Sequence, residues 1–168
     1  GWVPHWEKTY GIAAINAAGS LFSEVMPFWY SAKSDGSVSL ISGTSSTALR
    51  DVARAARAQG QRVTPSIVDA TGKGVLAAIL VDPARRAAHI QSIVSVVNTG
   101  IDGKAYDGID IDYEGFAFTD GRSTWATTQP GWIAFIKELG AALHGAGKTL
   151  SITVPPTWSS TSVSYWVY

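Results

Sequence analysis

Three acidic residues stand at every second position of one short hydrophobic run, residues 106–114. They are Asp110, Asp112 and Glu114. Because side chains alternate between the two faces of a β-strand, the three carboxyl groups are expected to share one face, about 7 Å apart in steps of two residues. Carboxyl groups at this spacing repel one another in a low-dielectric interior, so at least one should hold a proton near neutral pH. A general acid requires such a proton.

The order of these acids along the strand suggests different roles. Glu114 stands last, nearest to the carboxyl end of the predicted strand, and is expected to donate the proton to a leaving oxygen. Asp112 lies one step deeper, where it can hydrogen-bond either Glu114 or a substrate. Asp110 lies deeper still and is expected to share a proton with Asp112. In a β/α barrel the active site lies at the carboxyl ends of the strands, so all three are candidate catalytic residues.

Two other interpretations compete with catalysis. An acidic run is most often a solvated loop, but these acids alternate with isoleucine, which a loop does not need. Carboxylates also bind Mg²⁺ or Ca²⁺, and ligands at strand spacing would suit such a site. The histidines that could support a metal, His5, His89 and His144, show no paired spacing, and the last two fall in predicted helices. We therefore expect no metal and no cofactor, and expect these histidines to be surface or packing residues.

The segments around the acids alternate between β-like and helical patterns. The predicted strands are residues 1–4, 24–30, 62–68, 106–113 and 149–154, with a hairpin return at 38–41. The predicted helices are residues 10–18, residues 44–59, a helix that begins at Pro83 after its cap Asp82, and a helix that begins at Pro130. Such alternation predicts a parallel sheet with right-handed crossovers.

The predicted fold class is α/β, as a partial TIM (β/α)8 barrel with about five β/α units and parallel strands. No G-x-G-x-x-G follows a strand, and residues 72–74 lack the upstream glycine and the trailing Ser or Thr of a P-loop. A full barrel needs about 250 residues. We therefore expect residues 1–168 to form one incomplete domain, the N-terminal portion of a barrel. Because an open half barrel exposes strand edges and apolar faces, we expect self-association or a missing C-terminal half.

Composition excludes several classes of protein. The chain has 13 basic and 13 acidic residues, and a nucleic-acid binder would instead show a basic surplus. Hydrophobic residues make up 46% of the chain and charged residues 15%, which is typical of a globular protein. The apolar runs are shorter than the roughly 18 residues of a membrane helix, so no membrane partner is expected. The sequence contains neither a cysteine nor the pattern of a signal peptide.

The spacing Asp107-x-x-Asp110-x-Asp112-x-Glu114 resembles the signature of family 18 glycoside hydrolases, the chitinases and their relatives. Four acids at fixed spacing, ending a hydrophobic strand in a β/α pattern, rarely arise by chance. The resemblance covers essentially the whole chain, as strands one to five of the catalytic barrel.

A second segment, residues 63–67, resembles the third strand of that family, which usually reads Ser-x-Gly-Gly. Ser66 fits this pattern and is therefore a predicted substrate-binding residue, whereas Val68 and Asp69 replace the two glycines. The altered segment is similar to that of relatives that act on bacterial or spore peptidoglycan, which makes peptidoglycan the close alternative to chitin.

The resemblance implies a retaining mechanism without an enzyme nucleophile. Glu114 would protonate the glycosidic oxygen, and the 2-acetamido oxygen of the substrate would attack the anomeric carbon. Asp112 would orient the acetamido nitrogen, and Asp110 would tune Asp112 from beneath. Asp107, at the start of the strand, is expected to be structural. A tyrosine and an aromatic residue on later strands complete the site in the family, so this chain alone is expected to be inactive without them.

The chain has seven tryptophans, and aromatic rings commonly cover the apolar faces of sugars. Trp29, Tyr30 and Trp158 follow predicted strand ends and are predicted to bind the substrate, with Trp2 as a weaker candidate. A core position is an equally good interpretation of each aromatic taken alone.

The resemblance implies a glycoside hydrolase that cleaves β-1,4-linked N-acetylglucosamine polymers outside the cell. The predicted partner is therefore a polysaccharide, chitin or peptidoglycan, and the predicted location is secreted. A non-catalytic lectin-like protein is a different class, but such members commonly lose the acid that Glu114 provides here. A metal-dependent hydrolase is a third class, which chelation by EDTA would identify.

Overall fold

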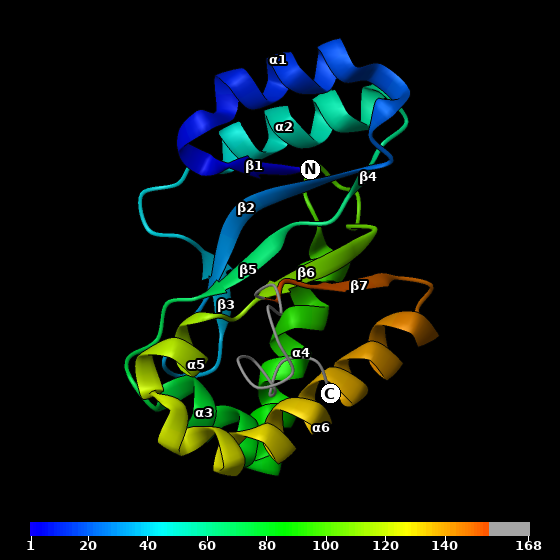
Figure 1. Cartoon of the computed structure of the whole chain (residues 1–168). Helices are drawn as coiled ribbons and strands as arrows, with labels where there is room; N and C mark the ends of the chain where they lie inside the picture. Colours follow the sequence, from blue (N-terminus) through cyan, green and yellow to red (C-terminus); the bar gives the residue numbers. More distant parts are fainter. Residues whose placement is uncertain (155–168) are drawn as a thin grey trace.

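The computed structural model describes residues 1–154, without the side chains of residues 115–117. The predicted sugar contact Trp158 lies outside the described residues. In Figure 1, α1 and α2 lie beside β1 and β2, while α4 and α6 lie on the side of β6 and β7, and α3 packs against α4 and α6. The elements are β1 (Trp2–Pro4), α1 (Lys8–Ala18), β2 (Glu24–Ala32), β3 (Val38–Leu40), α2 (Ser46–Ala58), β4 (Arg62–Val63), β5 (Ser66–Asp69), α3 (Val75–Val81), α4 (Pro83–Thr99), β6 (Gly108–Asp112), α5 (Gly115–Asp120), α6 (Trp125–Gly145) and β7 (Thr149–Ile152).

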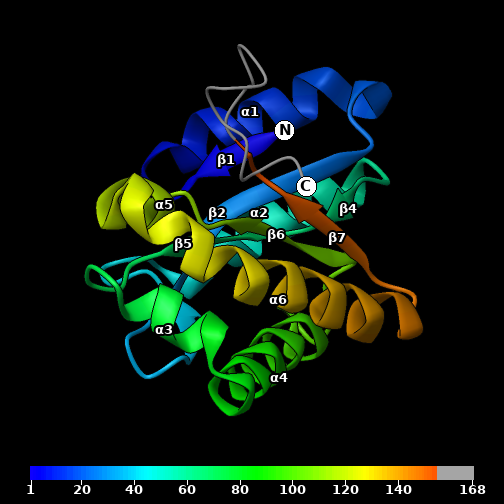
Figure 2. The same cartoon turned by 60° about the horizontal axis from the view of Figure 1, so that its bottom comes forward.

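The strands form one sheet whose main path runs β1-β2-β5-β6-β7, with every neighbouring pair parallel. Helices connect the consecutive strands of this path along the chain and flank the sheet (Figure 2), as in the wall of a β/α barrel. Five parallel strands in sequence order confirm the predicted partial barrel. The predicted hairpin is also confirmed, because β3 pairs antiparallel with β2.

Local sequence signals explain how the helices begin. Ser45 caps α2 by accepting a hydrogen bond from the backbone N–H of Ala48, and Asp82 caps α4 by accepting from two backbone N–H groups. Pro83 is the first residue of α4, where its missing N–H costs no hydrogen bond. The predicted cap of α4, Asp82, is therefore confirmed.

Three predicted boundaries need correction. The segment predicted as one strand over residues 62–68 is two strands, β4 and β5, separated by Thr64 and Pro65. Helix α3 has no counterpart in the prediction, because its seven residues are too few for a clear helical period. Helix α6 begins at Trp125, and Pro130 lies inside it. A proline can stand in a helix at the loss of one backbone hydrogen bond, so its presence did not mark the helix start.

The two faces of the sheet differ in character. One face carries Ile67, Ile109 and Ile111, which are fully buried in the hydrophobic core formed with the helices. On the other face, Ser66 of β5 is directly opposite Asp110 of β6, which is opposite Ser151 of β7. The predicted alternation in β6 is therefore confirmed, and it places its acids on the face away from the core.

The start of β6 depends on a close approach that only glycine permits. A Cβ on Gly108 would lie 2.3 Å from the backbone oxygen of Thr149 in β7. A Cβ on Gly145, in the last turn of α6, would have no atom within 4 Å.

We predict that Gly108→Ala lowers the free energy of unfolding by about 1–3 kcal/mol, because β6 and β7 must move apart to admit the methyl group. Gly145→Ala is the matched control and should raise it by about 0.4–1 kcal/mol, since alanine loses less backbone entropy on folding. Urea unfolding of both variants measures the difference. Equal stability of Gly108→Ala and the parent chain would contradict the close approach.

Candidate active site

The three predicted acids are together at the carboxyl end of β6. Asp110 and Asp112 lie within the strand, and Glu114 follows it as the residue that precedes α5. Asp110 is fully buried, whereas Asp112 and Glu114 are partly exposed. Exposure thus rises along the chain toward the end of the strand, as a site open to a substrate requires.

Asp110 is held by side chains from three other strands or strand ends. Its Oδ2 atom accepts hydrogen bonds from Ser66 Oγ at 2.6 Å, Trp2 Nε1 at 3.2 Å and Thr153 Oγ1 at 3.5 Å. Its Oδ1 atom is buried and has no hydrogen-bond partner among the described residues. These contacts fix the carboxyl group and leave one oxygen directed at no protein group.

Ser66 lies beneath the site and contacts its deepest acid, Asp110. Its side chain is fully buried, and its hydroxyl donates to Asp110. The prediction that Ser66 binds the substrate is corrected accordingly: it positions the deepest carboxyl group.

Asp112 has the electrostatic surroundings expected of an acid that changes protonation near neutral pH. Burial raises its pKa, and the negative charges of Glu114 and Asp110 raise it further, to about 6. Its Oδ1 atom is buried without a hydrogen-bond partner among the described residues. The Oδ1 atoms of Asp110 and Asp112 both lack a hydrogen-bond partner among the described residues, and a proton shared between the two carboxyl groups stays a prediction.

The residue between the two outer acids is anchored in the core. Tyr113 is fully buried, and its hydroxyl lies 2.8 Å from His89 Nε2. The other ring nitrogen, Nδ1, lies 2.7 Å from the carbonyl oxygen of Gly36, which can only accept. Nδ1 therefore carries the hydrogen, and neutral His89 accepts from Tyr113 through Nε2. Burial lowers the pKa of His89, which agrees with this neutral form.

Asp107 links strands and does not reach the site. Its Oδ2 atom accepts a hydrogen bond from the backbone N–H of Val63 at 2.8 Å, and its own N–H donates to the carbonyl oxygen of Val63 at 3.0 Å. These contacts fix the start of β6 against β4.

The aromatic residues predicted to bind sugar are not where the sequence placed them. Trp29 is 0% exposed and Tyr30 is 8% exposed, and the Tyr30 hydroxyl is hydrogen-bonded to that of Tyr106 at 3.0 Å in the core. Neither ring presents a face to a ligand, so both predictions are corrected to core positions. Trp2 and Trp6 are exposed instead, at 58% and 64%.

Trp6 is not predicted from the sequence, although it lies two residues after the end of β1, where a barrel strand ends at the active-site side. Its ring packs edge-on against Phe28, with 6.1 Å between centroids. Trp2 borders a hollow of about 450 Å³ on the same face of the sheet as Asp110, lined by Gly1, Trp2, Met26, Ser151, Ile152, Thr153 and Val154. Trp2 and Thr153 both contact Asp110, so the hollow adjoins the buried carboxyl group.

Two absences among the described residues bear on the site. Among the described residues, no group of three or more His, Cys, Asp or Glu side chains could hold a metal ion. Within the same part of the chain, none of the helices has the length and apolar character that crossing a membrane requires.

Residues 6–167 match the glycosyl hydrolases family 18, and the chain belongs to this family. Comparison with the curated proteins gives no match. Among solved structures, the chain is similar to the C-terminal domain of a putative chitinase from Desulfitobacterium hafniense, with a TM-score of 0.71 and 23% identity, over 99% of this chain and 47% of that one. A class V chitinase from Pseudomonas fluorescens gives a TM-score of 0.76 and 22% identity, over 98% of this chain and 47% of that one.

The spore cortex-lytic enzyme SleL from Bacillus megaterium gives a TM-score of 0.73 and 17% identity, over 99% of this chain and 36% of that one. These likenesses establish the fold, an α/β fold that forms part of a barrel. The chain spans less than half the length of these three structures.

The pKa of Asp112 predicts a pH-dependent stability. Since this pKa is raised in the folded protein, the folded state binds more protons than the unfolded chain between about pH 4 and pH 6, and stability falls as the pH rises through this window. Asp112→Asn should remove this loss of stability. The difference between parent and variant should be less than roughly 3 kcal/mol, because solvent screens the half-exposed carboxyl group. Urea unfolding at several pH values measures it. An identical pH profile in parent and variant would contradict the raised pKa.

His89 should act in the opposite direction. Its lowered pKa means that the unfolded chain takes up a proton first, so stability is lost as the pH falls below about 6.5. His89→Gln should remove most of this fall in stability at acid pH, which is the acid limb of the profile. It should also lower stability near pH 7.5, because the buried ring contacts are lost. His144→Gln, on the exposed face of α6, is the matched control for replacing a histidine outside the core. Unfolding curves between pH 5 and pH 7.5 decide, and an acid limb that persists in His89→Gln would count against the buried neutral ring.

Proposed function

We propose that this chain provides the catalytic strand of a glycoside hydrolase that cleaves β-1,4-linked N-acetylglucosamine polymers, with chitin as the first candidate. The observation that carries the proposal is that Asp110 and Asp112 lie in β6 and Glu114 directly beyond its carboxyl end, with the pKa of Asp112 raised to about 6. Membership of the glycosyl hydrolases family 18 supports it. So does the presence of Glu114, which a purely sugar-binding relative would not need.

In the proposed reaction, Glu114 donates a proton to the glycosidic oxygen as the bond to the anomeric carbon breaks. The 2-acetamido oxygen of the same sugar attacks that carbon and forms a cyclic oxazolinium ion. The unpartnered oxygen of Asp112 accepts a hydrogen bond from the acetamido N–H, and its charge stabilises the positive charge that develops. Water activated by Glu114 then opens the ring with overall retention of configuration.

Asp110 acts through Asp112 in this scheme. Its charge contributes to the raised pKa of Asp112, and its own position is fixed by Ser66 and Trp2. Removing the Ser66 hydroxyl would therefore disturb the acid pair from below without touching the substrate.

The whole enzyme is proposed to contain more than residues 1–168, which would form the N-terminal portion of its catalytic domain. The similar solved structures are more than twice as long as the part that matches. We propose that the remaining strands, in one polypeptide or in an associated chain, close the barrel over the open sheet face. A polymeric substrate of this kind also leads us to propose an extracellular location.

Peptidoglycan of the bacterial or spore wall is the second candidate substrate. It is favoured by Val68 and Asp69 in place of the usual glycines after Ser66. It is also favoured by the likeness to a spore cortex-lytic enzyme.

The test is hydrolysis of fluorogenic chitobioside and chitotrioside, and of purified peptidoglycan, by the parent chain and by Glu114→Gln, each assayed alone and with the remaining strands of the barrel supplied. Loss of the general acid should reduce the rate by about 10²–10⁴-fold, whereas Glu7→Gln, an exposed acid outside the site, should leave it unchanged. EDTA should have no effect.

Hydrolysis that survives Glu114→Gln would contradict the assignment of the acid. A folded chain that turns over neither polymer, even when the remaining strands are supplied, would point to a binding role.

A further inference from the structure

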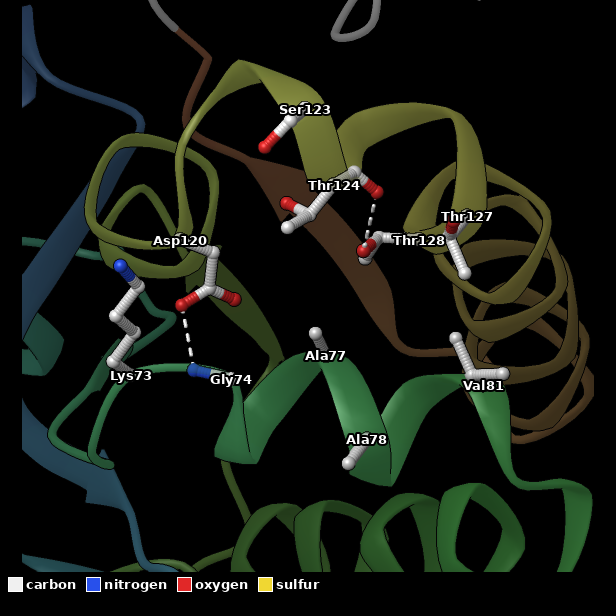
Figure 3. Close-up of a pocket in the computed structure, with 10 residues that line it drawn as sticks. All are labelled: Lys73, Gly74, Ala77, Ala78, Val81, Asp120, Ser123, Thr124, Thr127 and Thr128. Carbon is white, nitrogen blue, oxygen red and sulfur yellow. Dashed lines mark hydrogen bonds between the residues drawn. The ribbon is translucent and has the colours of Figure 1, made fainter.

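A second hollow lies away from the open sheet face, between α3 and the start of α6 (Figure 3). It has a volume of about 410 Å³ and is lined by Lys73, Gly74, Ala77, Ala78, Val81, Asp120, Ser123, Thr124, Thr127 and Thr128. The two helices are in backbone contact at one end, because a Cβ on Gly131 of α6 would lie 2.8 Å from the Leu80 carbonyl oxygen of α3.

Asp120 is the reason to regard this hollow as a binding site. It is only 7% exposed, and its Oδ1 atom accepts a hydrogen bond from the backbone N–H of Gly74 at 2.6 Å. Its Oδ2 atom is buried and has no hydrogen-bond partner among the described residues. Figure 3 shows this oxygen directed into the space between α3 and α6. A buried acceptor without a partner is costly, so a ligand that donates a hydrogen bond there gains affinity.

The other lining groups select a neutral ligand with several hydroxyls. The hydroxyls of Thr124 and Thr128 donate to backbone carbonyls at 2.8 Å and 3.1 Å, which leaves their lone pairs free to accept. Ala77 and Val81 provide apolar surface on the opposite side. Lys73 and Asp120 give the lining one charge of each sign, and a hard cation would need about six oxygen ligands that one carboxyl group does not supply.

We propose that this pocket binds an N-acetylglucosamine unit of the polymer, with a sugar hydroxyl or amide N–H donating to Asp120 Oδ2. The choice of ligand rests on the proposed function. The pocket is close to the catalytic end of β6, because Glu114 precedes α5 and Asp120 ends it. At 1.5 Å per residue, this six-residue helix spans about 9 Å. A polymer held at Asp120 would thus be kept near the proton donor, and its binding would fix the helix that follows Glu114.

The test is an NMR titration of the ¹⁵N-labelled chain with the N-acetylglucosamine tetramer. The reporters are the amide of Gly74, which is bonded to Asp120, and the amide of Asp112 in the catalytic strand. We expect saturable shifts at Gly74. Asp120→Asn retains an oxygen for the Gly74 N–H and replaces the free acceptor with a donor. The dissociation constant obtained from the Gly74 titration should therefore rise at least 10-fold.

Two further variants keep the test independent of folding and of catalysis. Thr127→Val, at an exposed position of α6, removes a hydroxyl from the pocket and leaves the protein core unaltered. It should weaken binding several-fold. Glu114→Gln should leave the Gly74 titration unchanged. Shifts confined to Asp112 would overturn the pocket and leave the proposed function standing. Gly74 shifts that persist unaltered in Asp120→Asn and Thr127→Val would also overturn it.

Discussion

Repulsion among acids at the carboxyl end of one short strand is the constraint on which the site depends. Asp110 and Asp112 in β6 and Glu114 just beyond it can be brought together only if the strand is fixed from the other side. The core face of β6 does this with Ile109 and Ile111, which are fully buried. Tyr113, which follows Asp112, is held by its hydrogen bond to the buried His89, and Gly108, the first residue of β6, lies in close contact with β7. The favourable packing of one face therefore offsets the electrostatic cost on the other.

The part of the site that follows from strand alternation could be predicted from the sequence. Isoleucine and acid at alternate positions already determine which face of β6 is buried, and the acidic spacing identifies the family. The aromatic contacts could not be predicted in this way. The register between β2 and β5 shifts between Phe28 and Tyr30, so Tyr30 is opposite Ile67 on the core side of the sheet. A β-bulge of this kind turns side chains to the other face, and no composition signal marks it.

Contacts between segments that are distant in the chain could not be predicted from the sequence either. Ser66 was expected to meet the substrate, yet it donates to Asp110, which lies 44 residues further along the chain. The unpartnered oxygen of Asp120 depends on the loop before α3, which is 46 residues away, and the short helix itself carries no clear periodic pattern. Tertiary packing decides such positions, whereas local periodicity decides only which element forms.

The electrostatic coupling of the acids is the central claim, and a ¹³C NMR titration of the Asp112 carboxyl group tests it most directly. The account predicts a midpoint near pH 6 in the parent chain and a lower midpoint in Glu114→Gln, because one of the two negative charges that raise the pKa is then removed. A midpoint near 3.8, the ordinary value for an aspartate, and one that Glu114→Gln does not move, would contradict the account.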